Sequence, residues 1–126
     1  MREQFSILVV DDNESARYAM ARGLRAAGYK TMEACSGAQA LEFAEYVSAV
    51  ILDVHLPDLL GWEVCRLLRS RQSTSNVPVI HVSARHASGA DTAQSRDCGA
   101  DAFFSSPVDP EALVALLDRL LAARAG

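Results

Sequence analysis

Short apolar runs alternate along the chain with segments whose apolar residues recur every three or four positions. A strand buried on both faces is apolar throughout, whereas a helix that covers a core is apolar along one stripe. The alternation predicts an α/β fold, in which a parallel sheet carries helices on both faces. The predicted strands occupy residues 7–10, 29–34, 49–53, 79–83 and 102–105.

Helix ends are marked by recognisable residues. Gly28 follows the first helix at the position where glycine commonly ends one. Ser36 should cap the second helix, with Gln39 completing a capping box, and Asp109 should cap the last, with Pro110 at its first position. The predicted inner positions are Ala16, Met20, Leu24 and Ala27 in the first helix, Ala40, Leu41 and Ala44 in the second, Val64, Cys65 and Leu68 in the third (62–69), and Leu113, Leu116, Leu117, Leu120 and Leu121 in the last.

The fourth helical segment, residues 85–98, is the weakest. Its apolar residues are small, and Gly89 interrupts it. Because it would bury little apolar surface, we expect this segment to be the least stable element and the natural mobile part of the fold.

The strand at 49–53 ends in a carboxylate, Asp53, which is unusual for an otherwise apolar run. Pro57 keeps the strand from continuing, and Gly61 is expected to supply turn freedom before the next helix. A carboxylate at the mouth of a buried strand suggests a functional role, and this makes Asp53 the main candidate residue.

Composition narrows the possible functions. The 126 residues suit a single domain spanning 1–126, and half of them are hydrophobic. A net charge of -4 without a basic stripe argues against nucleic-acid binding. The first apolar run is too short for a signal or membrane segment, so we expect a cytoplasmic protein. Cys35, Cys65 and Cys98 are widely spaced without a CxxC, and are interpreted as reduced thiols without a metal or redox role.

Polar residues stand at the carboxyl ends of the first, third and fourth predicted strands. The order of the strands does not follow from periodicity. In the doubly wound order 2-1-3-4-5, ligands bind outside the carboxyl ends of the strands, next to the switch point. In that order Asp11, Asp12, Asp53 and Ser83 would converge at one edge of the sheet.

Three converging carboxylates require a positive partner. At 4 Å and an effective dielectric of 20, each pair repels by about 4 kcal/mol. A proton, a basic side chain or a divalent cation would offset this repulsion, and an all-oxygen site with open positions suits Mg²⁺. The metal would neutralise a phosphoryl group while Asp53 attacks it, and the Ser83 hydroxyl could bind a phosphoryl oxygen.

Each residue also has a structural explanation. Asp12 or Asn13 could simply cap the first helix, although capping explains carboxylates at several strand ends less well. His55 and His81 have no partners at metal-ligand spacing, so surface or packing roles are expected for both.

The chain resembles the receiver domain of response regulators in two-component signalling over essentially its whole length. Four motifs match. They are residues 7–13, Leu52-Asp53 with Pro57 and Gly61, Val82-Ser83-Ala84, and residues 99–103 leading to Pro107. The resemblance implies the flavodoxin-like (βα)5 fold with strand order 2-1-3-4-5. It also implies a signalling domain rather than an enzyme, phosphorylated on Asp53 by a histidine kinase or histidine phosphotransfer protein.

The resemblance further implies residue roles. Mg²⁺ would be held by Asp11 or Asp12, by Asp53 and by the backbone carbonyl of His55. Ser83, with Ala84 beside it, and Phe103 would relay phosphorylation to the face formed by the fourth helix, fifth strand and fifth helix. That face is also a possible homodimer interface.

One position departs from the family. The lysine that normally precedes the proline after the fifth strand is Ser106 here, and the only lysine in the chain, Lys30, should lie at the opposite end of the sheet. A lost charge-assisted hydrogen bond is worth about 1.5–3 kcal/mol, enough to weaken the coupling of phosphorylation to conformation. Arg85 is a possible compensating cation, and a solvated arginine is the simpler interpretation.

Three functional hypotheses follow. The first is a phosphoacceptor receiver, either a stand-alone regulator or a piece of a larger regulator or hybrid kinase. The second is a degenerate receiver that acts as a phosphorylation-independent interaction module because of Ser106. The third is a flavodoxin-like cofactor enzyme or a small phosphatase, which the acidic loop after the first strand and the missing P-loop pattern both disfavour.

Overall fold

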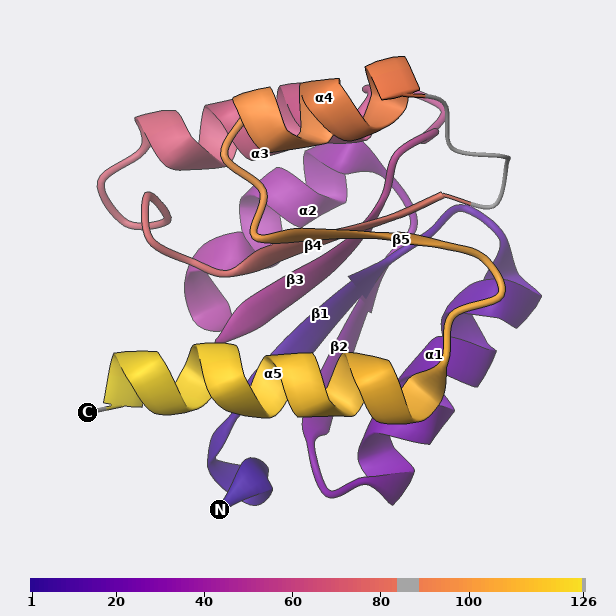
Figure 1. Cartoon of the computed structure of the whole chain (residues 1–126), viewed down its shortest axis with the longest axis vertical. Coiled ribbons are helices and arrows are strands. Elements are labelled where there is room, and N and C mark those ends of the chain that lie inside the picture. Colours follow the sequence, from indigo (N-terminus) through magenta and orange to yellow (C-terminus); the bar gives the residue numbers. More distant parts are fainter. Residues whose placement is uncertain (84–88, 126) are drawn as a thin grey trace.

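The computed structural model describes residues 1–83 and 89–125. It contains one five-stranded parallel sheet in the order β2-β1-β3-β4-β5, so the predicted fold class and strand order are confirmed. Helices α1 and α5 cover one face of the sheet, and α2, α3 and α4 cover the other (Figure 1).

The strands and helices follow the predicted alternation closely. The strands are β1 (Ser6–Val10), β2 (Lys30–Ala34), β3 (Ala49–Asp53), β4 (Val79–Ser83) and β5 (Ala102–Ser105). The helices are α1 (Glu14–Ala26), α2 (Gly37–Phe43), α3 (Gly61–Ser70), α4 (Gly89–Asp97) and α5 (Pro110–Ala125), with short 3-10 turns η1 (Arg2–Gln4) and η2 (Ala44–Tyr46).

The sheet separates two hydrophobic cores, because its apolar strands present side chains to both faces. Leu24 of α1 and Leu113, Leu117 and Leu121 of α5 pack on one face. Residues of α2 and α3 pack on the other, together with the alternate side chains of the strands. This explains why β3, at the centre of the sheet, is apolar until Asp53 at its carboxyl end.

Parallel register brings those carboxyl ends to one edge. Val10 pairs with Leu52, and Asp53 pairs with Val82, so the residues after β1 and at the end of β3 are neighbours. Lys30 pairs with Ser6, the first residue of β1, and therefore lies at the opposite end of the sheet from Asp53, as predicted.

Most of the predicted helix caps are present. Asn13, rather than Asp12, caps α1 by accepting a 2.8 Å hydrogen bond from the Ala16 amide. Ser36 caps α2 through the Gln39 amide at 3.2 Å. The Gln39 side chain accepts from the Cys35 amide instead of closing a capping box on Ser36.

The inner stripe of α1 differs from the prediction. Leu24 is buried, but Ala16 is exposed and Met20 only half-buried, whereas Ala21 is fully buried. The reason is that the first turns of α1 border an open crevice rather than a packed neighbour. The α5 stripe is confirmed at Leu113, Leu117 and Leu121, which are buried, whereas Leu116 and Leu120 are half-buried against the same core.

Gly61 serves a different purpose from the predicted one. It is the first residue of α3 and is not among the glycines with positive φ, so turn freedom does not explain it. A Cβ at this position would lie 2.8 Å from the Val54 Cα and 2.9 Å from the Asp53 carbonyl oxygen. Glycine is required because α3 begins directly against the backbone of the β3 end.

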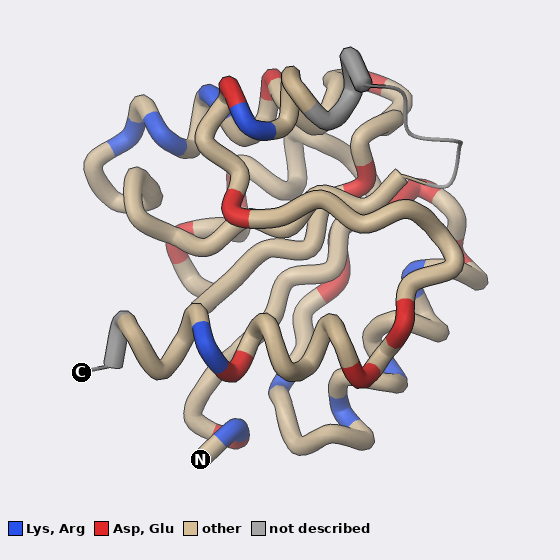
Figure 2. The backbone as a smooth tube through the Cα atoms, viewed as in Figure 1, with Lys and Arg blue, Asp and Glu red and all other residues tan. Residues whose placement is uncertain are grey.

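Helix α4 begins at Gly89, so the predicted 85–98 segment is confirmed only in its second part, and residues 84–88 lie outside the described residues. Among the α4 side chains that the structure describes, Ser95 is the buried one. Within the described part of the chain, lysines and arginines are spread over several elements rather than gathered in one stripe (Figure 2). No described helix is long and apolar enough to cross a membrane.

Candidate functional site: an acidic cluster at the carboxyl edge of the sheet

Asp11 and Asp12 stand in the turn that joins β1 to α1. The Asp11 amide donates to the Ala34 carbonyl of β2 at 3.1 Å, which continues the strand pairing one residue past β1. One Asp11 carboxylate oxygen accepts a 2.9 Å hydrogen bond from the Asn13 amide. Asp11 is half-buried, whereas Asp12 is exposed and does not cap the helix.

Asp53 ends β3 beside this turn. It is half-buried, and its carboxylate accepts a 3.1 Å hydrogen bond from the His55 amide. The start of α3 packs against its backbone carbonyl, as described for Gly61. The position of Asp53 is therefore held from both sides, by the β3 ladder and by α3.

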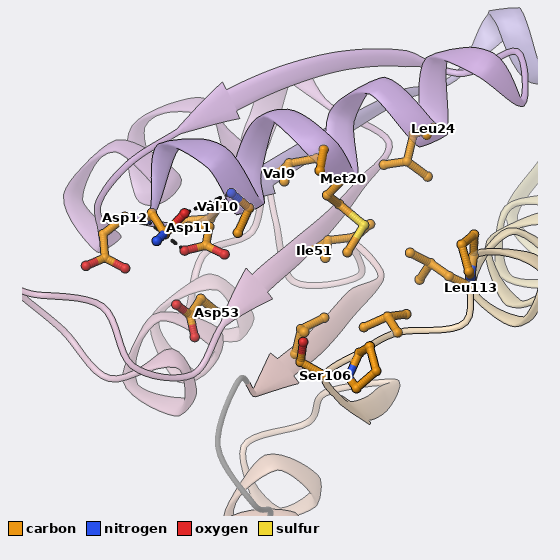
Figure 3. Close-up of a pocket in the computed structure, with 18 of the residues that line it drawn as sticks. Val9, Val10, Asp11, Asp12, Met20, Leu24, Ile51, Asp53, Ser106 and Leu113 are labelled. Atoms are coloured by element: carbon orange, nitrogen blue, oxygen red, sulfur yellow. Dashed lines mark hydrogen bonds between the residues drawn. The ribbon is translucent and has the colours of Figure 1, made fainter.

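Carboxylate oxygens of Asp11, Asp12 and Asp53 lie within 4.8 Å of one another. Figure 3 shows Asp53 on one side of the crevice mouth, facing the turn that carries Asp11 and Asp12. Within the described residues, no ion pair joins a lysine or arginine to any of the three carboxylates. Arg17 donates a hydrogen bond to the Asp11 backbone carbonyl and pairs with Glu33.

Burial and mutual repulsion favour the protonated forms of these acids. Burial, followed by the charges of Asp11 and Asp12, raises the pKa of Asp53 to about 6, although the hydrogen bond from the His55 amide opposes the shift. Burial and the neighbouring Asp12 likewise raise the pKa of Asp11. The fold therefore holds negative charges together at a cost in stability, a feature common at functional sites.

The donor set fits a hard divalent cation. Three carboxylates supply oxygen ligands at a partly exposed edge, and Mg²⁺ prefers oxygen ligands while keeping several waters. The backbone of His55 lies two residues after Asp53, and His55 lines the same crevice. A divalent cation here would remove the repulsion that raises the pKa of Asp53.

The predicted relay residues occupy the neighbouring strands. Ser83 ends β4 and is fully buried, and its carbonyl accepts a 2.7 Å hydrogen bond from the Ser106 amide. Phe103 is half-buried in β5, paired in register with His81. Ala84 and Arg85 lie outside the described residues, so the predicted compensating role of Arg85 stays a prediction.

A crevice of about 640 Å³ extends from the acidic cluster between α1 and α5. Its walls are mainly apolar and include Met20 and Val108, and Ser106 borders it opposite the α1 side (Figure 3). Ser106 is exposed, and the peptide bond to Pro107 is cis. Sequence reasoning missed this crevice, because apolar residues on two separate helices give no sign that the helices stand apart.

The histidines and cysteines have contrasting surroundings. Cys35 is exposed, whereas Cys65 and Cys98 are buried. His81 is fully buried and hydrogen-bonded through both ring nitrogens. Burial lowers the pKa of His81 to about 4, so its ring is neutral.

Comparison with known proteins gives one consistent family. Residues 7–118 match the family model described as the response regulator receiver domain. The response regulator MprA of Mycolicibacterium vanbaalenii is 38% identical over 117 residues, which cover 91% of this chain and 49% of that protein. The transcriptional regulatory protein GltR of Pseudomonas aeruginosa is 37% identical over 119 residues, with 92% and 48% covered. The chain thus spans about half the length of these curated relatives.

Solved structures agree with this result. A response regulator from Chloroflexus aurantiacus has a TM-score of 0.87 and 28% identity, and the match covers 94% of this chain and 98% of that one. The receiver domain of the sensor histidine kinase PA1611 from Pseudomonas aeruginosa has a TM-score of 0.85, 28% identity and the same coverage. That structure is described as having a magnesium ion coordinated in its active site cleft.

Proposed function

This chain belongs to the response-regulator receiver family, and from that premise we propose that it is a Mg²⁺-dependent phosphoacceptor in which Asp53 receives the phosphoryl group. The partner would be a phosphorylated histidine on a histidine kinase or on a histidine phosphotransfer protein. The role is that of a signalling domain that accepts a phosphoryl group and loses it again, rather than that of an enzyme with a separate substrate.

The acidic cluster carries this proposal. Asp53 and its two acidic neighbours meet within 4.8 Å at the carboxyl edge of the sheet, with no described cation paired to them. A purely structural role would leave their repulsion without compensation, whereas a bound divalent cation would offset it. Asp53 is the member that two elements hold in place, which suits a residue that must attack along a defined direction.

Asp11, Asp12 and Asp53, together with the His55 carbonyl, would hold the Mg²⁺ ion. When bound, the ion supplies positive charge that neutralises the phosphoryl oxygens. The PA1611 receiver domain, whose structure is described with magnesium in the cleft, supports this choice of metal.

Asp53 would act as a nucleophile through its ionised carboxylate. Its oxygen forms a bond to phosphorus while the phosphorus–nitrogen bond of the phosphohistidine breaks, and the imidazole leaves with the electron pair and takes up a proton. Because the pKa of Asp53 is about 6, the carboxylate is mostly ionised at neutral pH even before a cation binds. The Asp53 acyl phosphate would carry more negative charge than the carboxylate it replaces.

Ser83 and Phe103 are the residues through which the new charge would act on the rest of the fold. The Ser83 hydroxyl would bind a phosphoryl oxygen, and Phe103, on the adjacent strand, would change its packing. The face formed by α4, β5 and α5 would then bind a partner or a second copy of the chain. The small buried surface of the described part of α4 supports its role as the moving element.

Ser106 sets the expected strength of this response. A serine hydroxyl cannot supply the charge-assisted hydrogen bond of a lysine ammonium to the phosphoryl group. We therefore expect phosphorylation of Asp53 to proceed but to shift the conformational equilibrium less than in relatives that carry the lysine.

The test uses acetyl phosphate and Mg²⁺ with intact-mass detection. The wild-type chain should gain one phosphoryl group, Asp53→Asn should gain none, and removing Mg²⁺ with a chelator should abolish the gain. Asp58→Asn is the matched control, because Asp58 is exposed and binds the Gly37 and Ala38 amides rather than the acidic cluster. This variant should be phosphorylated normally.

Beryllofluoride with backbone NMR then measures the response. Shifts that spread from Asp53 to Phe103 and α4 would support a working receiver. Shifts confined to the acidic cluster would indicate the phosphorylation-independent interaction module instead. Absence of any mass gain in the wild-type chain, or a gain that persists in Asp53→Asn, would refute the assignment of Asp53.

A further inference from the structure

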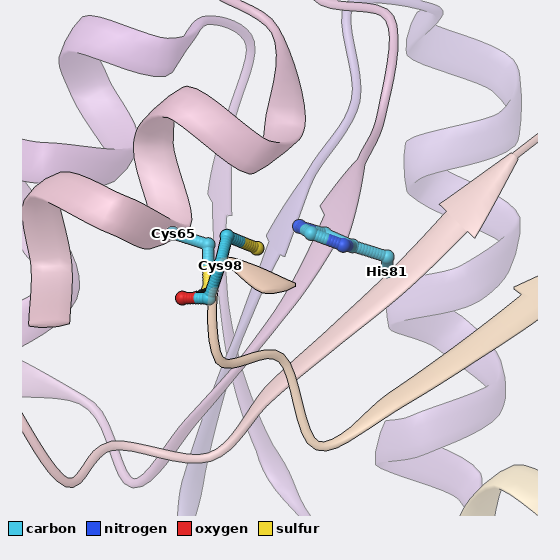
Figure 4. A group of neighbouring side chains, drawn as sticks. All are labelled: Cys65, His81 and Cys98. Carbon is cyan, nitrogen blue, oxygen red and sulfur yellow. Dashed lines mark hydrogen bonds between the residues drawn. The ribbon is translucent and has the colours of Figure 1, made fainter. Parts of the chain in front are cut away.

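Three candidate metal ligands, two of them soft sulfur ligands, meet in the core on the opposite side of the sheet from the apolar crevice. Cys65 projects from α3, His81 from β4, and Cys98 stands one residue beyond α4. Their ligand atoms, two thiol sulfurs and one imidazole nitrogen, lie within 4.8 Å of one another. Figure 4 shows the three side chains converging from their separate elements.

The chemistry of this donor set differs from that of the acidic cluster. Two thiolates and a neutral imidazole suit Zn²⁺, whereas Mg²⁺ takes oxygen ligands. Two thiolates would also balance the charge of Zn²⁺, so the filled site would carry no net charge. Neutrality matters here because Cys65 and His81 are fully buried and Cys98 is 6% exposed within an apolar core.

The surroundings of His81 fit a metal ligand. A carbonyl can only accept, so the 3.1 Å contact with the Gly61 carbonyl places the proton on Nε2. Nδ1 then carries a lone pair, which accepts a 2.6 Å hydrogen bond from the Ser95 hydroxyl. A metal-binding histidine normally keeps its second nitrogen hydrogen-bonded, and His81 has a partner for either nitrogen.

We propose that Cys65, His81 and Cys98 form a structural zinc site, with the fourth position taken by the buried Ser95 hydroxyl or by a water molecule. The proposed zinc site shares no ligand with the acidic cluster, so it does not rest on the proposed phosphoacceptor function. It ties the C-terminal end of α4 to α3 and β4. Ser95 is the buried side chain among those described in α4, so the helix has few other contacts to hold it in place. A bound zinc ion would therefore limit its motion.

Metal binding exchanges protons for zinc. In the metal-free form the Cys65 thiol donates to the Cys98 carbonyl at 3.4 Å, and the Cys98 thiol donates to the Ser95 carbonyl at 3.1 Å. Burial raises the pKa of Cys65 to about 12, so this thiol is protonated at neutral pH. Zn²⁺ would replace two S–H bonds with two Zn–S bonds and release two protons to solvent. No change of oxidation state is involved.

Co²⁺ is the probe, because tetrahedral thiolate coordination gives it intense visible bands and an ultraviolet thiolate-to-metal transition. The full chain is reduced, freed of metal, and titrated with Co²⁺ in excess Mg²⁺, which occupies the acidic cluster. We expect both bands to saturate at one Co²⁺ per chain and to disappear when Zn²⁺ is added. Zn²⁺ at 100 times its Kd should also shift the folding equilibrium about 100-fold toward the folded state.

Matched variants identify the ligands. Cys65→Ala and Cys98→Ala should each weaken or abolish the thiolate band, whereas Cys35→Ala removes the exposed cysteine and should leave the spectrum unchanged. Asp53→Asn should also leave it unchanged, so a failure of the phosphoacceptor proposal would not affect this result. The zinc site is refuted if folded, reduced wild-type protein shows no thiolate band. It is equally refuted if the band survives in both Cys65→Ala and Cys98→Ala.

Discussion

Replacing Asp53, the proposed phosphoacceptor, with its neutral isostere should stabilise the fold, and should do so only where Asp53 is ionised. Asp53→Asn keeps an oxygen that accepts from the His55 amide, and removes the charge that burial and the other two carboxylates oppose. The variant therefore separates the electrostatic cost of the site from its hydrogen bonding.

The size of the effect follows from the pKa of Asp53, about 6 when folded against an ordinary 3.8. A raised pKa means that the folded state binds the proton more tightly. Ionised Asp53 therefore lowers the free energy of unfolding. This loss is absent below the pKa of Asp53 in the unfolded chain, grows as the pH rises from about 4 to 6, and is complete above the pKa in the folded chain. The full pKa shift would lower the free energy of unfolding by about 3 kcal/mol at pH 7.5 and by about 1 kcal/mol at pH 4.5. Because the carboxylate is only half-buried, we expect about 2–3 kcal/mol at pH 7.5.

Urea unfolding in EDTA, at both pH values, measures this difference. The gain of Asp53→Asn over wild type should shrink by more than half between pH 7.5 and pH 4.5. Asp58→Asn is a control that should change stability in the opposite direction. Hydrogen bonds from the Gly37 and Ala38 amides lower the pKa of Asp58, so its ionised form stabilises the fold and its replacement should destabilise the protein at neutral pH.

A gain for Asp53→Asn that is equal at both pH values would refute the electrostatic explanation, because shape or hydrogen bonding would then be responsible. If Asp53→Asn were less stable than wild type at pH 7.5, the placement of Asp53 as a half-buried carboxylate beside two other acids would be contradicted. Saturating Mg²⁺ should remove most of the difference, since the cation offsets the repulsion only when Asp53 is charged.

Three further substitutions, one of them with a matched glycine control, test the site. Gly61→Ala should destabilise the fold by about 1–3 kcal/mol in urea unfolding, because the new Cβ would lie 2.9 Å from the Asp53 carbonyl oxygen. Gly23→Ala is the control, because a Cβ at that position would meet no atom within 4 Å. This variant should raise the free energy of unfolding by about 0.5–1 kcal/mol. Ser106→Lys should lower the pKa of Asp53 in an NMR titration and widen the shifts caused by beryllofluoride; unchanged remote shifts would contradict the role given to Ser106. Asp12→Asn should also lower the pKa of Asp53, and should weaken Mg²⁺ binding by about tenfold or more in calorimetry.

The sequence predicts the sheet well because apolar runs and their ends are local signals. Asp11 and Asp53 could be placed at the same edge of the sheet because parallel strands align their carboxyl ends. The capping of α1 by Asn13 was one of the open alternatives, and the structure decides it. A family resemblance supplied the strand order, which periodicity could not.

Features that depend on distant contacts were not predictable. The need for glycine at position 61 arises from the approach of α3 to β3, and nothing in the local sequence reports a neighbouring backbone. The exposure of Ala16 depends on the gap between α1 and α5. Cys65 and His81 lie on separate elements, so a search for closely spaced ligands could not find the cluster they form with Cys98.

Gly61 has a consequence for communication within the molecule. One side of this residue abuts the backbone of Asp53, and its carbonyl accepts the hydrogen bond from His81. A single peptide unit therefore separates the acidic cluster from the cysteine–histidine cluster. If a ligand bound at one cluster displaces this unit and alters the other cluster, the two ligands change each other's affinity by the same factor, since thermodynamic linkage is reciprocal. The first turn of α3 therefore contacts a member of each cluster.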